Sequence, residues 1–157
     1  MKTQNNRKKR LTKTISYLSF SLFLILISCK SDDTPTDCGC HSEIINTISE
    51  NTGLIGKLFY KNSNTGNNYN NYKYWIVYVE QNCTNCIHSM IVCNENILSN
   101  INNIPELNKG AIFNSITELD DALDVQFSGH LKEICNPIFH PADYTYENIT
   151  LTNIEQQ

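Results

Sequence analysis

Six of the chain's seven cysteines lie in the body of the sequence, between positions 38 and 135. The whole chain has only 157 residues, so it fits one domain with one small hydrophobic core. In a small domain, an even set of cysteines predicts a disulfide framework, but the spacing leaves the pairing open. The candidate bridge residues are Cys38, Cys40, Cys83, Cys86, Cys93 and Cys135.

The seventh cysteine, Cys29, follows an N-terminal segment that differs from the rest of the chain. Residues 1–28 carry six basic side chains and no acidic one, and residues 15–27 are apolar except for three serines and one tyrosine. This apolar run is too short for a comfortable bilayer span, which needs about 20 residues. A basic region, a short apolar region and a small residue are typical of a secretory signal peptide. We therefore expect residues 1–28 to be a signal peptide.

The end of this segment carries a more specific motif. Leu26-Ile27-Ser28-Cys29 resembles the lipobox of bacterial lipoproteins, in which an aliphatic residue, a tolerant position and a small residue precede a cysteine. The resemblance implies that the Cys29 thiol takes up a diacylglycerol and that a peptidase cuts after Ser28. Two acyl chains of the palmitate kind, plus a third on the new amino terminus, would anchor the protein durably. The alternative is an ordinary signal anchor with an accidental cysteine.

An acidic pair follows the cysteine. Lys30-Ser31-Asp32-Asp33 resembles the surface-export tag of lipoproteins in the Bacteroidota group. The resemblance implies an outer-membrane lipoprotein whose domain is exposed on the cell surface. The alternative is a solvated tether in which the acids occur by chance. We expect residues 29–43 to be a lipidated tether and residues 44–157 to be a small, disulfide-supported β domain.

The charge balance constrains the partners. Removal of residues 1–28 leaves six basic and 16 acidic residues, a formal net charge of −10. A nucleic-acid binder must neutralise phosphates, so this balance argues against DNA or RNA as a partner. The expected partners are the membrane, through the lipid anchor, and a saccharide or a protein.

The body is expected to be mainly β. Aromatic, β-branched or alternating runs predict strands, whereas the spacing of Ile97, Leu98, Ile101 and Ile104 predicts a short helix that Pro105 ends. Gly129 suits a bulge or a barrel corner. The expected strands are 54–60, 73–80, 90–93, 125–131 and 149–151.

Three strands, a short helix and two further strands resemble the element order of the OB-fold. The resemblance covers residues 54–154 and implies a five-stranded Greek-key barrel. The alternative is another small β-sandwich or β-barrel with a different topology.

The second expected strand places three tyrosines on one face. If Trp75 and Val77 face the core, then Tyr72, Tyr74 and Tyr78 form an outward row. OB-folds use their second and third strands as a platform for nucleotides or sugars, so this row is a candidate ligand platform. The alternative is that the tyrosines are half-buried strand formers.

The pair Cys83-Thr84-Asn85-Cys86 supports an alternative function. A C-x-x-C pair after an apolar run is typical of thiol–disulfide chemistry, although the β-branched run that follows favours a strand over a helix. Together with His88 and the Cys38-Gly39-Cys40-His41 run, the pair also offers ligands for a metal ion. The alternative to a structural role is therefore a thiol–disulfide or metal-handling lipoprotein that uses Cys83 and Cys86.

No catalytic constellation emerges from the sequence. The four histidines, at positions 41, 88, 130 and 140, are dispersed, and no Ser or Cys stands beside a base at a known catalytic spacing. We expect a non-enzymatic binding or structural module with no cofactor and no metal.

Overall fold

The computed structural model describes residues 37–62, 69–83, 85–139 and 143–157. These residues belong to one compact unit. Within them, no helix has both the length and the apolar character needed to cross a membrane. The expected signal peptide, Cys29 and the acidic pair at positions 32–33 lie outside the described residues.

The fold is mainly β, as expected. Seven strands form one mixed sheet in the order β1-β6-β7-β4-β3-β2-β5. The strands are β1 (Ile44–Ile48), β2 (Ile55–Lys61), β3 (Lys73–Val79), β4 (Ile87–Val92), β5 (Glu106–Leu107), β6 (Leu123–Lys132) and β7 (Tyr144–Gln156). Three short 3-10 helices connect them: η1 (Glu50–Thr52), η2 (Glu95–Asn100) and η3 (Ile116–Leu119).

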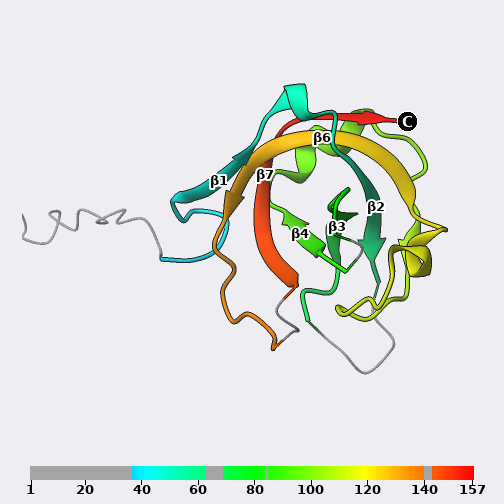
Figure 1. The fold of residues 1–157 in the computed structure, drawn as a ribbon. Coiled ribbons are helices and arrows are strands. Elements are labelled where there is room, and N and C mark those ends of the chain that lie inside the picture. Colours follow the sequence, from blue (N-terminus) through cyan, green and yellow to red (C-terminus); the bar gives the residue numbers. More distant parts are fainter. Residues whose placement is uncertain (1–36, 63–68, 84, 140–142) are drawn as a thin grey trace, which may run out of the picture. The chain divides into compact units, whose positions relative to one another are not determined.

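Five of the strands close into a partial ring. In addition to its place in the sheet, β2 pairs with β6, so that β2, β3, β4, β7 and β6 follow one another around the ring. The β4–β7 pair is parallel and the other pairs of the ring are antiparallel. In Figure 1 the long strands β6 and β7 curve around the shorter strands β2, β3 and β4.

Strand alternation divides the hydrophobic residues into two clusters. The first, which we call the ring core, takes buried side chains from all five ring strands, such as Leu58, Ile76 and Met90. The second, the cover core, joins the opposite faces of β2, β3 and β4 to residues 111–122 and to Ile134. Both faces of β3 are therefore buried at its centre, where Trp75, Ile76 and Val77 are all inaccessible to solvent.

The two ends of the ring differ. At the end where β3 begins and β4 finishes, η2 packs Leu98 into the ring core, with Ile97 and Ile101 beside it. We call this the closed end. At the opposite end β3 finishes and β4 begins, and we call this the open end.

Several expected elements differ from the observed ones. The expected helix at 97–104 is the 3-10 helix η2, which ends at Asn100. The sequence analysis assigned no strand to β1, where four of five residues are exposed, or to β5, which has two residues. β7 has 13 residues where three were expected, because polar residues interrupt its alternation.

The expected bulge at Gly129 is confirmed. The β6–β7 register shifts between Ser128 and Gly129. A Cβ on Gly129 would lie 2.6 Å from the carbonyl oxygen of Thr150, so no larger residue fits without a shift of the backbone. The extra residue of the bulge is Thr152 on β7, and its hydroxyl hydrogen-bonds the hydroxyl of the buried Ser128 at 2.8 Å.

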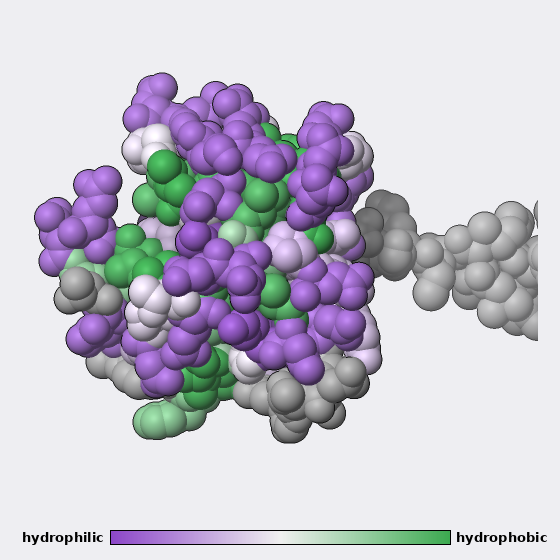
Figure 2. All heavy atoms as spheres, turned by 90° about the vertical axis from the view of Figure 1, so that its right-hand side faces the viewer, coloured by the Kyte–Doolittle hydropathy of each residue, from purple (hydrophilic) through white to green (hydrophobic). Residues whose placement is uncertain are grey.

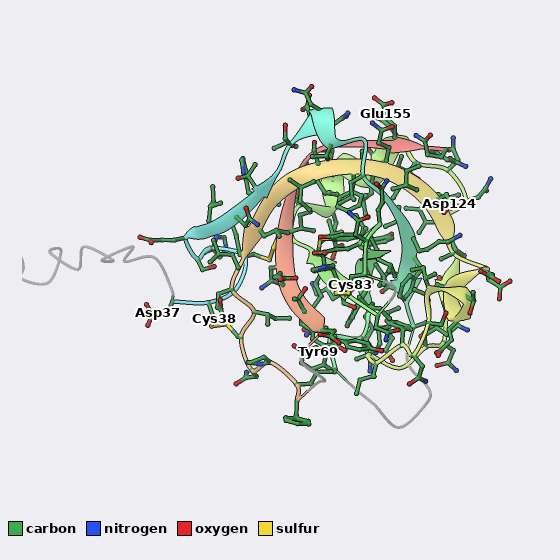
Figure 3. All side chains as sticks on the ribbon, in the orientation of Figure 1. Asp37, Cys38, Tyr69, Cys83, Asp124 and Glu155 are labelled. Atoms are coloured by element: carbon green, nitrogen blue, oxygen red, sulfur yellow. A yellow bond between two sulfur atoms is a disulfide. The ribbon has the colours of Figure 1, made fainter. Side chains whose placement is uncertain are left out.

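All six candidate cysteines are paired. The bridges are Cys38–Cys135, Cys40–Cys93 and Cys83–Cys86, with Cα–Cα distances of 5.1, 5.5 and 5.3 Å. The first two attach the start of the described chain to the body, and Figure 3 shows Cys38 beside the segment that follows β6. The backbone supports the same attachment, because the Gly39 N–H donates to the Glu133 carbonyl at 2.7 Å.

A buried lysine fixes the chain where it enters β3. Lys61, at the end of β2, has no exposed surface, and its ammonium donates to the Tyr69 carbonyl at 3.1 Å and to the Asn71 side chain. The same ammonium lies 5.7 Å from the centre of the Trp75 ring, a cation–π contact. Desolvation lowers the pKa of Lys61.

Candidate functional site

The three tyrosines of the expected platform lie in different surroundings. Tyr72 is 61% exposed, whereas Tyr74 and Tyr78 are half-buried and pack against the ring core. Ile76, between them on the same face, is fully buried. This face of β3 points into the ring, so Tyr74 and Tyr78 match the alternative of half-buried strand formers and not an outward row. Tyr74 packs edge-on against Tyr60 near the closed end, with ring centres 5.0 Å apart.

Tyr78 lies at the open end within a short stack of rings. Its ring is nearly parallel to that of His88, with centres 4.5 Å apart, and Phe127 lies 6.0 Å away on a tilted plane. Burial raises the pKa of Tyr78 to about 12, and the nearby carboxylates of Glu147 and Glu80 add to the effect. The phenol therefore keeps its proton at neutral pH and remains a hydrogen-bond donor.

A chain of hydrogen bonds links three strands behind Tyr78. The Thr145 hydroxyl donates to Glu147 Oε2 at 2.9 Å, and His88 Nδ1 lies 2.8 Å from the same hydroxyl oxygen. His88 Nε2 lies 3.1 Å from Glu80 Oε1. His88 and Thr145 are direct partners across the parallel β4–β7 pair, and Glu80 directly follows β3.

His88 thus connects two carboxylates through its two ring nitrogens. Nδ1 faces the Thr145 hydroxyl, which donates to Glu147, and Nε2 faces Glu80.

A pocket of about 460 Å³ opens beside Tyr78 and Glu80. It is lined by residues 52–55, which lead from η1 into β2, and by residues 78–82, which lead out of β3. The lining combines apolar surface, including Ile55 at 53% exposure, with the Glu80 carboxylate and the amides of Gln81 and Asn82. Neither segment contains a basic residue.

The sequence did not reveal this site. From the sequence, His88 was interpreted as one of four dispersed histidines and as a possible metal ligand beside Cys83 and Cys86, and no role was expected for Glu80, Thr145 or Glu147. These residues are up to 67 positions apart in the sequence, and only the parallel pairing of β4 with β7 brings them together. Period-2 alternation on β4 places His88 and Met90 on one face, but it does not say which strand lies beside them.

Of the other histidines, His130 hydrogen-bonds the Thr47 hydroxyl on β1 at 3.0 Å, and His140 lies outside the described residues. In the part of the chain that the structure describes, no group of three or more His, Cys, Asp or Glu side chains is arranged to hold a metal ion. The sulfurs of Cys83 and Cys86 are joined to each other.

The surface gives little sign of a large apolar docking site on the face drawn in Figure 2. Hydrophilic residues cover most of that face, and hydrophobic residues show in small patches between them. Large contiguous apolar patches are what mark protein or membrane interfaces.

The chain matches no protein-family model and has no significant match among curated proteins. The proposed function therefore rests on the pocket, the hydrogen-bond network and the sequence motifs.

Proposed function

We propose that this protein is a non-enzymatic outer-membrane lipoprotein whose β domain binds a neutral saccharide at the open end of the ring. The anchor rests on the Leu26-Ile27-Ser28-Cys29 motif, and the ligand rests on the pocket lined by residues 52–55 and 78–82. The three disulfides are compatible with an oxidising compartment outside the cytoplasm. The tag-like acidic pair favours the cell surface over the periplasmic face.

The anchor would hold the domain close to the membrane. Cys38, where the first bridge begins, follows Cys29 by nine positions, and a fully extended chain of that length reaches about 30 Å. The bridges of Cys38 and Cys40 fix the end of this tether to the body. Pulling forces on the anchor would therefore act on two covalent cross-links before they reached the sheet.

We further propose that the partial ring is an OB-like Greek-key barrel. In chain order its elements are β2, β3, β4, then η2, then β6 and β7, which is the order expected from the sequence. The pairing of β2 with β6 supports this proposal, because it joins the first strand of the ring to the fourth. β1 and β5 would then be additions to the outside of the barrel.

The chemistry of the pocket favours a neutral, hydroxyl-rich ligand. Amides and carboxylates offer paired hydrogen bonds to neighbouring hydroxyls, and the side chains of Leu54 and Ile55 offer apolar contact to the C–H faces of a sugar ring. The Tyr78 phenol supplies a donor. The Glu80 carboxylate and the absence of Lys or Arg from both lining segments disfavour phosphorylated or acidic ligands.

The anchor is tested by metabolic labelling with palmitate and by the mass of the mature N-terminus. We expect label in the wild-type protein, none in Cys29→Ala, and an N-terminal peptide that begins with an acylated cysteine at position 29. A wild-type protein that keeps its initiating methionine and an unmodified thiol would contradict the anchor.

The ligand is tested with an array of neutral and acidic glycans probed by the mature protein. We expect binding to neutral glycans and loss of that binding in Asn82→Ala, with Asn85→Ala, outside the pocket lining, as the matched control. Binding confined to acidic glycans, or to none, would contradict the saccharide proposal and leave the anchor proposal standing.

A further inference from the structure

The Cys83–Cys86 bridge differs from the other two in what it encloses. Its cysteines are separated by three positions, whereas the other bridges span 53 and 97 positions. A disulfide stabilises a fold mainly by restricting the unfolded chain, and the effect grows with the length of the closed loop. This bridge therefore has the smallest structural role of the three.

The turn that contains the bridge is also held by backbone hydrogen bonds. The Cys83 N–H donates to the Glu80 carbonyl at 3.2 Å, and the Cys86 N–H donates to the Cys83 carbonyl at 3.1 Å. The Glu80 N–H donates to the Cys86 carbonyl at 3.2 Å and extends the β3–β4 pairing into the turn. The path of the chain through this turn therefore has support that does not depend on the S–S bond.

The bridge lies where a second molecule can reach it. Cys83 and Cys86 are partly exposed, and their neighbours Gln81, Asn82 and Asn85 are exposed. Thiol–disulfide exchange requires that a thiolate approach one sulfur in line with the S–S bond, so access is a condition for it. Cys83 directly follows Gln81 and Asn82, which line the pocket.

We propose that Cys83 and Cys86 form a redox-active pair that accepts two electrons from a dithiol on another protein. A thiolate of that dithiol attacks one sulfur of the bridge, the Cys83–Cys86 S–S bond breaks, and a mixed disulfide forms. The second thiol of the partner then attacks the mixed disulfide. The partner leaves as a disulfide, and two protons and two electrons remain on Cys83 and Cys86 as two thiols. The other two bridges take no part.

The inference is independent of the saccharide proposal, because it concerns the sulfurs of the turn and not occupancy of the pocket. It predicts a hierarchy of reduction. The mature protein is incubated at neutral pH with rising concentrations of dithiothreitol, free thiols are trapped with N-ethylmaleimide, and the labelled peptides are identified by mass spectrometry. We expect Cys83 and Cys86 to be labelled at a reductant concentration at least about tenfold below that needed for the other four cysteines. Simultaneous reduction of all three bridges, or reduction of this one last, would overturn the proposal.

Two variants separate a reactive bridge from a structural one. Cys83→Ser/Cys86→Ser is expected to keep the wild-type fold and the other two bridges, but to lose the ability to oxidise a reduced two-cysteine peptide. Cys86→Ser alone keeps the Cys83 thiol and, after activation with a thiol-exchange reagent, is expected to trap that peptide as a mixed disulfide. Failure of the double variant to fold, or oxidation of the peptide by it at the wild-type rate, would overturn the proposal.

Discussion

The two ends of the ring are built from the same strands but from different chemistry. At the closed end, η2 buries Leu98 in the ring core, and Tyr60 packs against Tyr74. At the open end, the same face of β3 carries Tyr78, which stacks on His88 beside carboxylates and a pocket. The closed end therefore contributes chiefly to stability, while the open end carries the polar groups to which we assign the proposed ligand.

The bridges near the two ends also differ in the length of the loop that they close. Cys93 directly follows β4 at the closed end and is bridged to Cys40, 53 positions away, whereas the open end has the local Cys83–Cys86 bridge. Loop-closure entropy gives about 4 kcal/mol for a loop of the first length and about 2 kcal/mol for the second. The bridge at the closed end thus closes a long loop, whereas the Cys83–Cys86 bridge closes a short one. The third bridge, Cys38–Cys135, follows β6 and spans 97 positions.

Removal of the closed-end bridge should have the largest effect. We expect Cys40→Ser/Cys93→Ser to lower the free energy of unfolding by about 4 kcal/mol, because the unfolded chain regains the freedom of a long loop. Guanidinium denaturation measures the change, and Cys83→Ser/Cys86→Ser is the matched variant at the open end, with a loss of about 2 kcal/mol or less. Equal losses of unfolding free energy in the two variants would contradict the difference between the two ends.

Truncation of Leu98, which η2 buries at the closed end, should have the second-largest effect on stability. Leu98 is 4% exposed, so Leu98→Ala should lower the free energy of unfolding by about 3 kcal/mol through lost burial and a residual cavity. The affinity of the folded protein for the proposed neutral glycan should not change, because Leu98 lies away from the pocket lining. An affinity loss larger than about threefold, measured by calorimetry well below the melting temperature, would show that the two ends are coupled.

Substitution of Glu80 at the open end should weaken glycan binding and leave the free energy of unfolding nearly unchanged. Glu80→Gln is expected to weaken glycan binding about tenfold, since the carboxylate is a stronger acceptor than an amide. The free energy of unfolding should change by less than about 1 kcal/mol, because the glutamine amide can still donate to His88 Nε2 and the side chain is largely exposed. The control is Glu95→Gln at the closed end, which breaks a 3.6 Å surface pair with Lys73 and should alter neither quantity measurably. Unchanged glycan affinity in Glu80→Gln would remove this residue from the site.

The smallest expected effect concerns alkaline pH. The folded-state pKa of Tyr78 is raised to about 12 from an ordinary value near 10, so the native state holds the phenol proton more tightly than the unfolded state does. This contribution to stability is fully present below pH 10 and is lost as the pH rises toward 12. Because Tyr78 is only half-buried, solvent screening reduces the contribution to about 1 kcal/mol.

Tyr78→Phe should therefore flatten the alkaline fall of the unfolding free energy. The fall should not disappear, since burial also raises the pKa of Tyr146 to about 12. Tyr72→Phe is the control, because that ring is 61% exposed. Denaturant titrations at pH 9 to 11 measure the slope, and identical slopes for wild type and Tyr78→Phe would contradict the burial of this phenol.

The central strands of the fold were predictable from local pattern. β2, β3 and β6 coincide closely with the expected runs, because each has dense aromatic or β-branched residues or a clean alternation. β1 could not be recognised, since Ile44 and Ile45 are more than half exposed and the strand depends on its pairing with β6 rather than on burial. The 3-10 geometry of η2 could not be predicted either, because hydrophobic periodicity detects an apolar stripe but not the spacing of the backbone hydrogen bonds.

The candidate site was predictable only in part. The even cysteine set correctly indicated bridges among six residues, but their pairing depends on tertiary contacts that the spacing does not encode. Alternation correctly placed Tyr74, Ile76 and Tyr78 on one face of β3. It could not tell which face of β3 the ring encloses, because Trp75 and Val77 on the other face are buried under the cover core.

The most direct test of the division between the two ends is a backbone NMR titration of the mature domain with the neutral glycan selected on the array. The predicted result is chemical-shift changes in residues 52–55 and 78–82, with the resonances of η2 unmoved. Shift changes centred on η2 or on Tyr72, or none at all at saturating glycan, would contradict the account.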